Sequence, residues 1–178
     1  KAFIELGYSV NDSLLFAEQF GVPQKRARYF IVCSKSKDKV FTFPEKTAIQ
    51  AVTVNEAIGD LPRLKNGHNV SFKRYRACEA SSYAKSMKSK QNGCENHLVT
   101  RNNELIINRY KHIPQGGNWE NIPAQLMTNY KDRTRCHTGI YKRLSENAPS
   151  TVIGNYRKNM LIHPIENRGL SVREAARL

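Results

Sequence analysis

Residues 21–33, GVPQKRARYFIVC, decide how the N-terminal part of this chain folds. The segment begins with a Gly-Val-Pro turn, carries three cations within four residues and ends in an apolar run rich in β-branched and aromatic side chains. This pattern predicts a loop over 18–26, then a strand at 28–33 that looks buried. Residues 8–17 predict another strand, so we expect the two to form an antiparallel pair.

Three polar side chains alternate at the start of this segment. Alternate side chains of an extended backbone share a face, so Gln24, Arg26 and Arg28 are predicted to lie on one side, where three donors can share one pocket. For this motif taken by itself, a basic edge that caps a buried strand is the alternative interpretation.

The positive charge is concentrated in the second part of the chain. The 178 residues contain 29 Lys and Arg against 15 Asp and Glu, a net charge of +14, and 39% of them are hydrophobic, which is enough for a core. Residues 1–62 hold 8 basic and 7 acidic side chains, and residues 63–178 hold the other 21 and 8. This surplus suits a polyanionic partner that meets the basic half, although merely cationic proteins show it too.

Other classes are disfavoured by what the sequence lacks. No stretch approaches the roughly 18 consecutive apolar residues of a membrane span, and the first residues do not resemble a signal peptide, so we expect an intracellular chain without membrane contact. The four cysteines are scattered, as reduced thiols are. Cys94 and His97 have C-x-x-H spacing and Cys136 adjoins His137, so this grouping could bind metal. Because it lacks a second closely spaced ligand pair, buried or idle thiols are favoured and we expect no metal site.

Short elements are predicted beyond the strand pair. Capping boxes at Thr53 and Ser171 open helices, the first ended by Pro62, and the polar, basic stretch 63–96 indicates long loops or an adaptable surface. Further expected elements are a helix tail over 1–6, a helix over 105–110, a turn at 115–118, and strands at 151–153 and 160–163. Because both ends lie inside predicted helices, we expect the chain to continue beyond them.

Five segments of the sequence resemble the C5 cytosine-specific DNA methyltransferases, with the bacterial members closest. Residues 21–28, GVPQKRAR, resemble their Gln-x-Arg-x-Arg motif (motif VIII), and residues 168–178, RGLSVREAARL, are similar to their motif IX. Further matches are VTVNEAIGDLP at 52–62, HIPQGGNW at 112–119 and PSTVI at 149–153. Any one of these could arise by chance, but all five occur in family order.

The resemblance implies a fold and a division of the chain. The expected fold is α/β: the edge β-hairpin of a class I (Rossmann-like) methyltransferase domain, followed by a small mixed, β-containing target-recognition domain. Residues 1–50 would be the C-terminal remnant of the catalytic domain with motif VIII. Residues 51–178 would be the target-recognition domain with motif IX.

The resemblance also implies roles for the motif VIII residues. Enzymes of this family attack carbon 6 of a cytosine with a thiolate and methylate carbon 5 from S-adenosyl-L-methionine, so the base must be flipped out of the duplex. Donors at the O2 edge would stabilise the developing charge. Arg28 is expected to contact O2, Arg26 to support the pocket and a nearby phosphate, and Gln24 to help hold the loop.

In motif IX, Arg168 and Arg173 are expected to hold the junction between the recognition and catalytic domains. An Arg near a helix N-terminus opposes the helix dipole, so we expect Arg173 to be buried and paired with a carboxylate or carbonyl; a solvated Arg is the alternative. Thr151 and Val152 look like the Thr-Leu pair that positions the family's recognition loops. The segment 131–143, KDRTRCHTGIYKR, is expected to supply phosphate and base contacts, from Arg133, Arg135, His137, Tyr141 and Arg143, with Lys142 among its cations.

Several family motifs do not occur in these residues. There is no Pro-Cys-Gln for the nucleophile, no Glu-Asn-Val for the acid and no Phe-x-Gly-x-Gly for the cofactor. We therefore expect the chain to be inactive by itself and to act on double-stranded DNA in the bacterial cytoplasm, at the nucleoid, with an N-terminal catalytic region of the same protein or a separate subunit. A non-catalytic DNA-binding module and a basic scaffold or RNA-binding protein are the alternatives.

Overall fold

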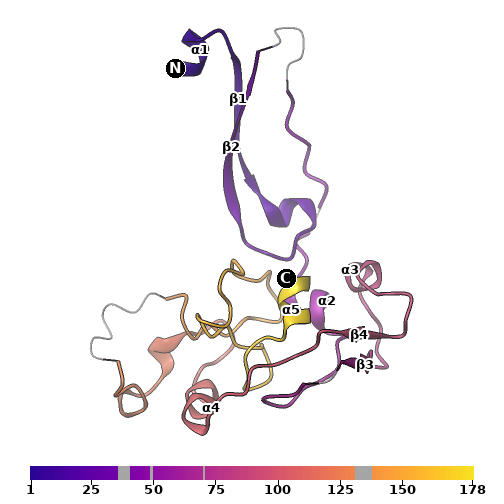
Figure 1. The fold of residues 1–178 in the computed structure, drawn as a ribbon, viewed down its shortest axis with the longest axis vertical. Coiled ribbons are helices and arrows are strands. Elements are labelled where there is room, and N and C mark those ends of the chain that lie inside the picture. The colour runs from indigo at the N-terminus through magenta and orange to yellow at the C-terminus, as the bar shows by residue number, and fades with distance from the viewer. Residues whose placement is uncertain (36–40, 49, 70, 131–137) are drawn as a thin grey trace.

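The computed structural model describes residues 1–35, 41–48, 50–69, 71–130 and 138–178. Figure 1 shows a long two-stranded hairpin that projects from a body of short helices and loops, with the C-terminal helix near the base of the hairpin. The described elements include two small two-stranded sheets, so the chain is a mixed α/β protein.

The predicted antiparallel pair is confirmed. Helix α1 (Ala2–Glu5) leads into β1 (Ser9–Phe16), which pairs with β2 (Ala27–Ser34) from Ser9 opposite Ser34 to Phe16 opposite Ala27. The 3-10 helix η1 (Ala17–Phe20) follows β1 and ends at Gly21, whose φ of 80° is left-handed. Glycine adopts this conformation without steric cost, so the turn can lead directly into the motif VIII segment.

The expectation that the second strand is buried is wrong for this chain. Tyr29 is 60% exposed, Ile31 58% and, on the neighbouring strand, Leu14 50%. The apolar run forms its strand by pairing with β1, but no described element packs over the hairpin to bury these side chains. That the hairpin forms the edge of a larger sheet stays a prediction.

One core of the body packs α2 (Val54–Ile58) against α5 (Val172–Arg177). Both predicted capping boxes are present, although α2 ends at Ile58, with Gly59 as its C-cap, before it reaches Pro62. The stretch 63–96 contains short elements as well as loops, which corrects the expectation. They are β3 (Phe72–Arg74), antiparallel to β4 (Gly93–Glu95), and α3 (Ser82–Ser86), capped by Ser81.

A second core surrounds α4 (Glu104–Lys111), with the short 3-10 helices η2 (Trp119–Asn121) and η3 (Ala124–Leu126) beside it. Tyr110 and Tyr141 are buried there, and Trp119 packs against this core. The predicted strands at 151–153 and 160–163 are wrong, because Ser150 and Ile162 each form only isolated bridges to other segments.

Neither membrane nor metal features occur in the part of the chain described above. Its helices are all too short or too polar to cross a bilayer. No three His, Cys, Asp or Glu side chains of the described residues gather as metal ligands. His97 instead hydrogen-bonds Ser171 Oγ at 2.8 Å and the Pro62 carbonyl at 2.7 Å, while Cys94 is a buried free thiol and Cys136 lies outside the described residues.

Candidate nucleic-acid interface

The two arginines of motif VIII lie at the end of the hairpin nearest the body. Arg28 pairs opposite Leu15 and is exposed, and its Nη1 donates only to the neighbouring Ala27 carbonyl, at 2.7 Å. Arg26 is half-buried, and its main-chain N–H donates to Glu18 at 3.3 Å. Within the described ranges no carboxylate forms an ion pair with either guanidinium. Both can therefore bind an acceptor from outside the chain.

Gln24 does not share a pocket with these arginines, which corrects that expectation. Its side chain is only 8% exposed, and Nε2 donates to the Leu178 carbonyl at 2.9 Å. A buried amide that is committed to a main-chain carbonyl has its donor in use. The contact fits the other expectation for Gln24, that it helps to hold the loop.

Three of the sequence motifs meet at Gln24. The Lys25 N–H donates to the Ser150 carbonyl, and the Ser150 N–H donates to the Pro23 carbonyl, both at 2.8 Å, in a parallel bridge centred on Gln24 and Ser150. Leu178, whose carbonyl accepts from Gln24, follows α5 directly. Motif VIII is thus joined both to the residue before Thr151 and to the end of motif IX.

Arg168 forms the centre of a buried ionic network. Its two Nη atoms donate to the two oxygens of Glu174 at 2.8 and 2.7 Å, and Glu174 also accepts the Ser171 N–H of its capping box at 2.7 Å. Burial opposes the charged form of Glu174, but Arg168 outweighs it and holds the pKa of this carboxyl at about 2. Glu174 in turn raises the pKa of Arg168 despite the burial of that guanidinium. The bidentate pair fixes α5 to the preceding loop.

Arg173 is half-buried, so the expectation that it is buried is wrong, whereas the expected carbonyl partner is confirmed. Its Nε donates to the Glu95 carbonyl at 2.9 Å. The buried arginine of this helix is Arg177, which pairs with Asp60 at 2.5 Å. Sequence reasoning missed this pair because Asp60 lies more than a hundred positions away, and no local spacing relates the two.

The structure describes only the second half of the segment 131–143. Arg133, Arg135 and His137, predicted to contact DNA, lie outside the described residues. Tyr141 and Arg143 are fully buried, which corrects the expectation that DNA can reach them. Arg143 donates to five main-chain carbonyls at 2.6 to 3.5 Å, and burial lowers its pKa. The acceptors are Tyr110, Ile113, His163, Pro164 and Glu166.

Arg109 is a buried residue that sequence reasoning missed. It donates to the hydroxyl of Tyr141 at 2.8 Å and to the Leu126 carbonyl at 2.7 Å, and its guanidinium lies over the Tyr130 ring. The sequence feature that could have identified it is its position on the inward face of the helix predicted at 105–110. Arg109 and Arg143 therefore hold loops together instead of contacting a partner.

Thr151 and Val152 lie beside a hollow of about 300 Å³. Thr151 is half-buried, whereas Val152 is 40% exposed. The other residues that line the hollow come from the segments before and after this pair, namely Thr138, Gly139, Lys142, Asn159 and Leu161. In Figure 1 the orange-to-yellow segment that follows Ser150 lies close to the base of the hairpin, consistent with the bridge to Gln24.

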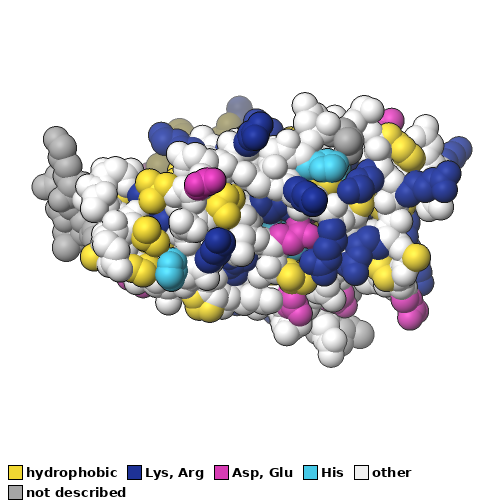
Figure 2. Space-filling model, turned by 90° about the horizontal axis from the view of Figure 1, so that it is seen from below, with side chains coloured by type: hydrophobic (Ala, Val, Ile, Leu, Met, Phe, Trp, Pro, Cys, Tyr) yellow, Lys and Arg dark blue, Asp and Glu magenta, His cyan; other side chains and the backbone are white. Residues whose placement is uncertain are grey.

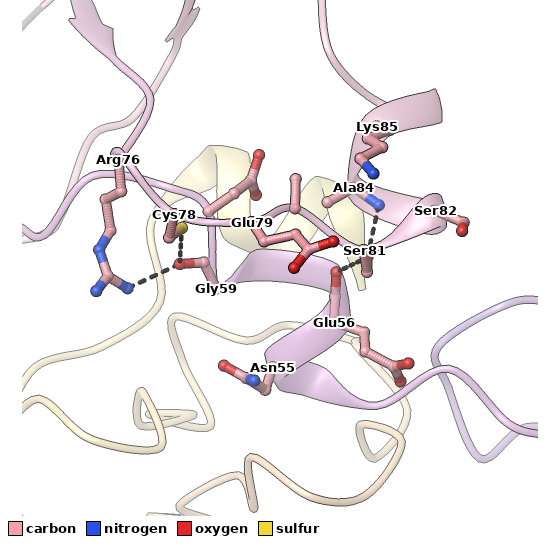
Figure 3. A pocket seen from close by; sticks show the side chains of 12 residues that line it. Asn55, Glu56, Gly59, Arg76, Cys78, Glu79, Ser81, Ser82, Ala84 and Lys85 are labelled. Carbon is pink, nitrogen blue, oxygen red and sulfur yellow. Dashed lines mark hydrogen bonds between the residues drawn. The ribbon is translucent and has the colours of Figure 1, made fainter.

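A larger cavity, of about 480 Å³, lies between α2 and α3 (Figure 3). Figure 3 shows the side chain of Glu79 lying across it toward Ser81, and Arg76 directed to the Gly59 carbonyl, which it reaches at 2.8 Å. Glu56 and Asp60 also line this cavity, so carboxylates offset the cations there. A phosphate backbone needs uncompensated positive charge, which makes this cavity unsuitable for DNA.

Basic side chains also gather far from the hairpin. Figure 2 views the end of the molecule opposite the hairpin and shows Lys and Arg side chains clustered over part of that face. Around β3, the Lys73 ammonium donates to the Arg63 carbonyl at 2.9 Å, and Lys65 and Arg74 are exposed. Charge by itself therefore does not single out one binding surface among the described residues.

Comparisons with known proteins agree with the resemblance. The family model described as C-5 cytosine-specific DNA methylase matches residues 1–178. The type II methyltransferases M.BbvI of Brevibacillus brevis and M1.HphI of Haemophilus parahaemolyticus are 33% and 32% identical over 97% and 99% of the chain. DNA (cytosine-5)-methyltransferase 1A of Oryza sativa subsp. japonica is 26% identical over 99%. The chain spans 39%, 40% and 15% of these three relatives.

A solved structure shows a similar fold. It is a crystal structure from E. coli, described as that of a DNA modification methyltransferase encoded within a prophage. The TM-score is 0.67 at 18% identity, and the match covers 98% of this chain and 51% of the other. At that identity, the likeness concerns the fold.

Proposed function

Because this chain belongs to the C-5 cytosine-specific DNA methylase family, we propose that it supplies the motif VIII edge and the DNA-recognition part of a cytosine-5 methyltransferase. The complete enzyme transfers a methyl group from S-adenosyl-L-methionine to carbon 5 of a cytosine flipped from a specific duplex sequence. The observation that carries the proposal is the junction at Gln24, which joins the segment of Arg26 and Arg28 to the residue before Thr151 and Val152.

The chemistry requires cations where motif VIII presents them. Addition of a thiolate to carbon 6 places electron density on the ring, and fixed donors at O2 stabilise that charge as it develops. Arg28 is exposed, and among the described residues its guanidinium donates to the Ala27 carbonyl, which leaves donors for this role. Arg26, held by its main chain near Glu18, supports the same pocket and a nearby phosphate.

The nucleophile and the cofactor belong to polypeptide outside these residues. None of the four cysteines follows a proline or precedes a glutamine. The two largest cavities described above are lined by the recognition part, and we derive no step through the cofactor from them. S-adenosyl-L-methionine is proposed to bind on the catalytic region, which is either the rest of the same protein or a separate subunit.

The test is methyl transfer by the complete protein. Labelled S-adenosyl-L-methionine and duplex DNA are expected to give label in cytosine, and replacing each cysteine of this chain by serine is expected to leave turnover intact. Specific duplex binding without incorporation would instead identify a non-catalytic DNA-binding module. Equal affinity for RNA and duplex DNA would identify a basic nucleic-acid scaffold.

A further inference from the structure

The hollow beside Thr151 lies next to two residues, Tyr141 and Arg143, that were expected to contact DNA and are buried instead. Tyr141 and Arg143 point into the core, whereas Lys142 between them is half-buried at the surface. The Tyr141 N–H donates to the Asn159 carbonyl, and the Ile162 N–H donates to the Lys142 carbonyl, both at 2.9 Å. These bonds hold Lys142 and Asn159 on adjacent segments of one wall.

The polar groups of the hollow have capacity to spare. The Lys142 ammonium donates to the Gly116 carbonyl, which anchors it and leaves two of its three protons for another acceptor. Across the residues that the structure describes, no carboxylate forms an ion pair with Lys142, and no group hydrogen-bonds the Asn159 side-chain amide. The hollow is therefore lined by two residues whose side chains keep donors for another acceptor.

The remaining lining is apolar. Val152 and Leu161 border the same space as Lys142 and Asn159. A phosphate contact would not favour apolar walls, but the edge of a base presents both hydrogen-bonding atoms and hydrocarbon surface in the major groove. A lysine that donates to N7 and O6 and an asparagine that pairs with N6 and N7 are typical of purine recognition.

We infer that this hollow reads one purine of the target sequence through its major-groove edge, with Lys142 donating to N7 and Asn159 completing the contact. The inference rests on the proposed function and adds to it the residues that select the sequence. The bridge between Gln24 and Ser150 places the reading site one residue from a segment fixed to motif VIII. Recognition of this purine and placement of the flipped cytosine are thus set by one rigid junction.

The experiment replaces single atoms of the DNA in binding assays with the complete methyltransferase. Its target is first determined by locating the methylated cytosines, and each purine of the target is then replaced by its 7-deaza analogue, which lacks the N7 acceptor. At one position we expect the native enzyme to lose about 10- to 100-fold in affinity. At that position Lys142→Ala should bind the analogue and natural DNA with the same affinity, because the variant already lacks the contact to N7.

Lys111→Ala is the matched control, because Lys111 is exposed on α4 and its ammonium donates to Asn108 of its own helix. It is expected to keep the native response to the analogue. Equal analogue losses in native enzyme and Lys142→Ala at every position would overturn the inference. The inference would also be overturned if Lys142→Ala lowered the affinity equally for all DNA sequences and reduced the salt dependence of binding by about one phosphate contact. Absence of cytosine methylation by the native enzyme would instead overturn the proposed function.

Discussion

The hairpin and the body use the same residue type in opposite ways. In the body, Arg143 and Arg168 are buried, and their donors are committed to carbonyls or to Glu174. In the hairpin, Arg28 is exposed, and its guanidinium donates to the carbonyl of the neighbouring Ala27. The difference teaches that a basic sequence does not by itself mark a binding surface. Part of the charge that suggests DNA in this chain serves as internal framework, and only the uncommitted cations are available to a partner.

The largest expected effect is on the buried arginines of the body, which form its internal framework. Arg168→Met removes the partner of Glu174 and leaves that buried carboxylate uncompensated, so we expect the free energy of unfolding to fall by about 3–5 kcal/mol. Urea unfolding measures the change. The matched control, Arg28→Met, removes the same charge from an exposed site and is expected to change stability by at most about 0.5 kcal/mol. Equal losses in the two variants would abolish the distinction between the regions.

The framework is also expected to respond to pH. Burial lowers the pKa of His163 to about 4, and its Nδ1 accepts the Ile165 and Glu166 N–H groups at 3.2 and 3.1 Å, so the folded protein keeps this ring neutral. In the unfolded chain His163 binds a proton with an ordinary pKa near 6.5. Its contribution to the free energy of unfolding is therefore fully present above pH 6.5 and is lost as the pH falls toward 4. The loss is about 3 kcal/mol.

His163→Asn separates this contribution from the others. Asparagine can present an acceptor to the same two N–H groups but does not titrate. The slope of stability between pH 6.5 and 4.5 should become smaller, although His97, whose pKa burial also lowers, keeps part of it. Below pH 4.5 the lowered pKa of Glu174 still gives acid destabilisation in both proteins. An unchanged slope in unfolding measured across this range would contradict the assignment to His163.

Local patterns predicted local structure well, and long-range placement poorly. The capping boxes at Thr53 and Ser171 and the pair of strands before and after Gly21 follow from neighbouring residues, and all are present. Whether an arginine is buried depends on segments far away in the chain. Arg173 and Arg177 lie on one short helix, yet only Arg177 meets Asp60 and is buried. Likewise, Lys142 and Arg143 are neighbouring cations, yet only Arg143 is buried.

Arg28→Ala tests the hairpin side of the comparison. In the complete methyltransferase we expect turnover to fall by about 100-fold, because the guanidinium acts mainly as charge develops in the ring, and affinity for duplex DNA to change by less than about threefold. Single-turnover kinetics and equilibrium binding measure the two quantities. Lys25→Ala is the control, because Lys25 is an exposed cation of the same segment and lies between the motif positions Gln24 and Arg26. Equal losses in turnover and affinity would show that Arg28 is a phosphate contact.

The smallest effect is expected where the two regions meet. Gln24→Ala removes the bond to the Leu178 carbonyl and should lower the free energy of unfolding by about 1 kcal/mol, whereas Gln125→Ala, at an exposed position, should not. Because Gln24 also lies at the bridge to Ser150, the same variant should raise the KM for DNA in the complete enzyme more than it lowers kcat. A lower kcat with unchanged stability and KM would place Gln24 with Arg28, as a donor to the base. The boundary between framework and binding residues would then lie within the body instead of at the base of the hairpin.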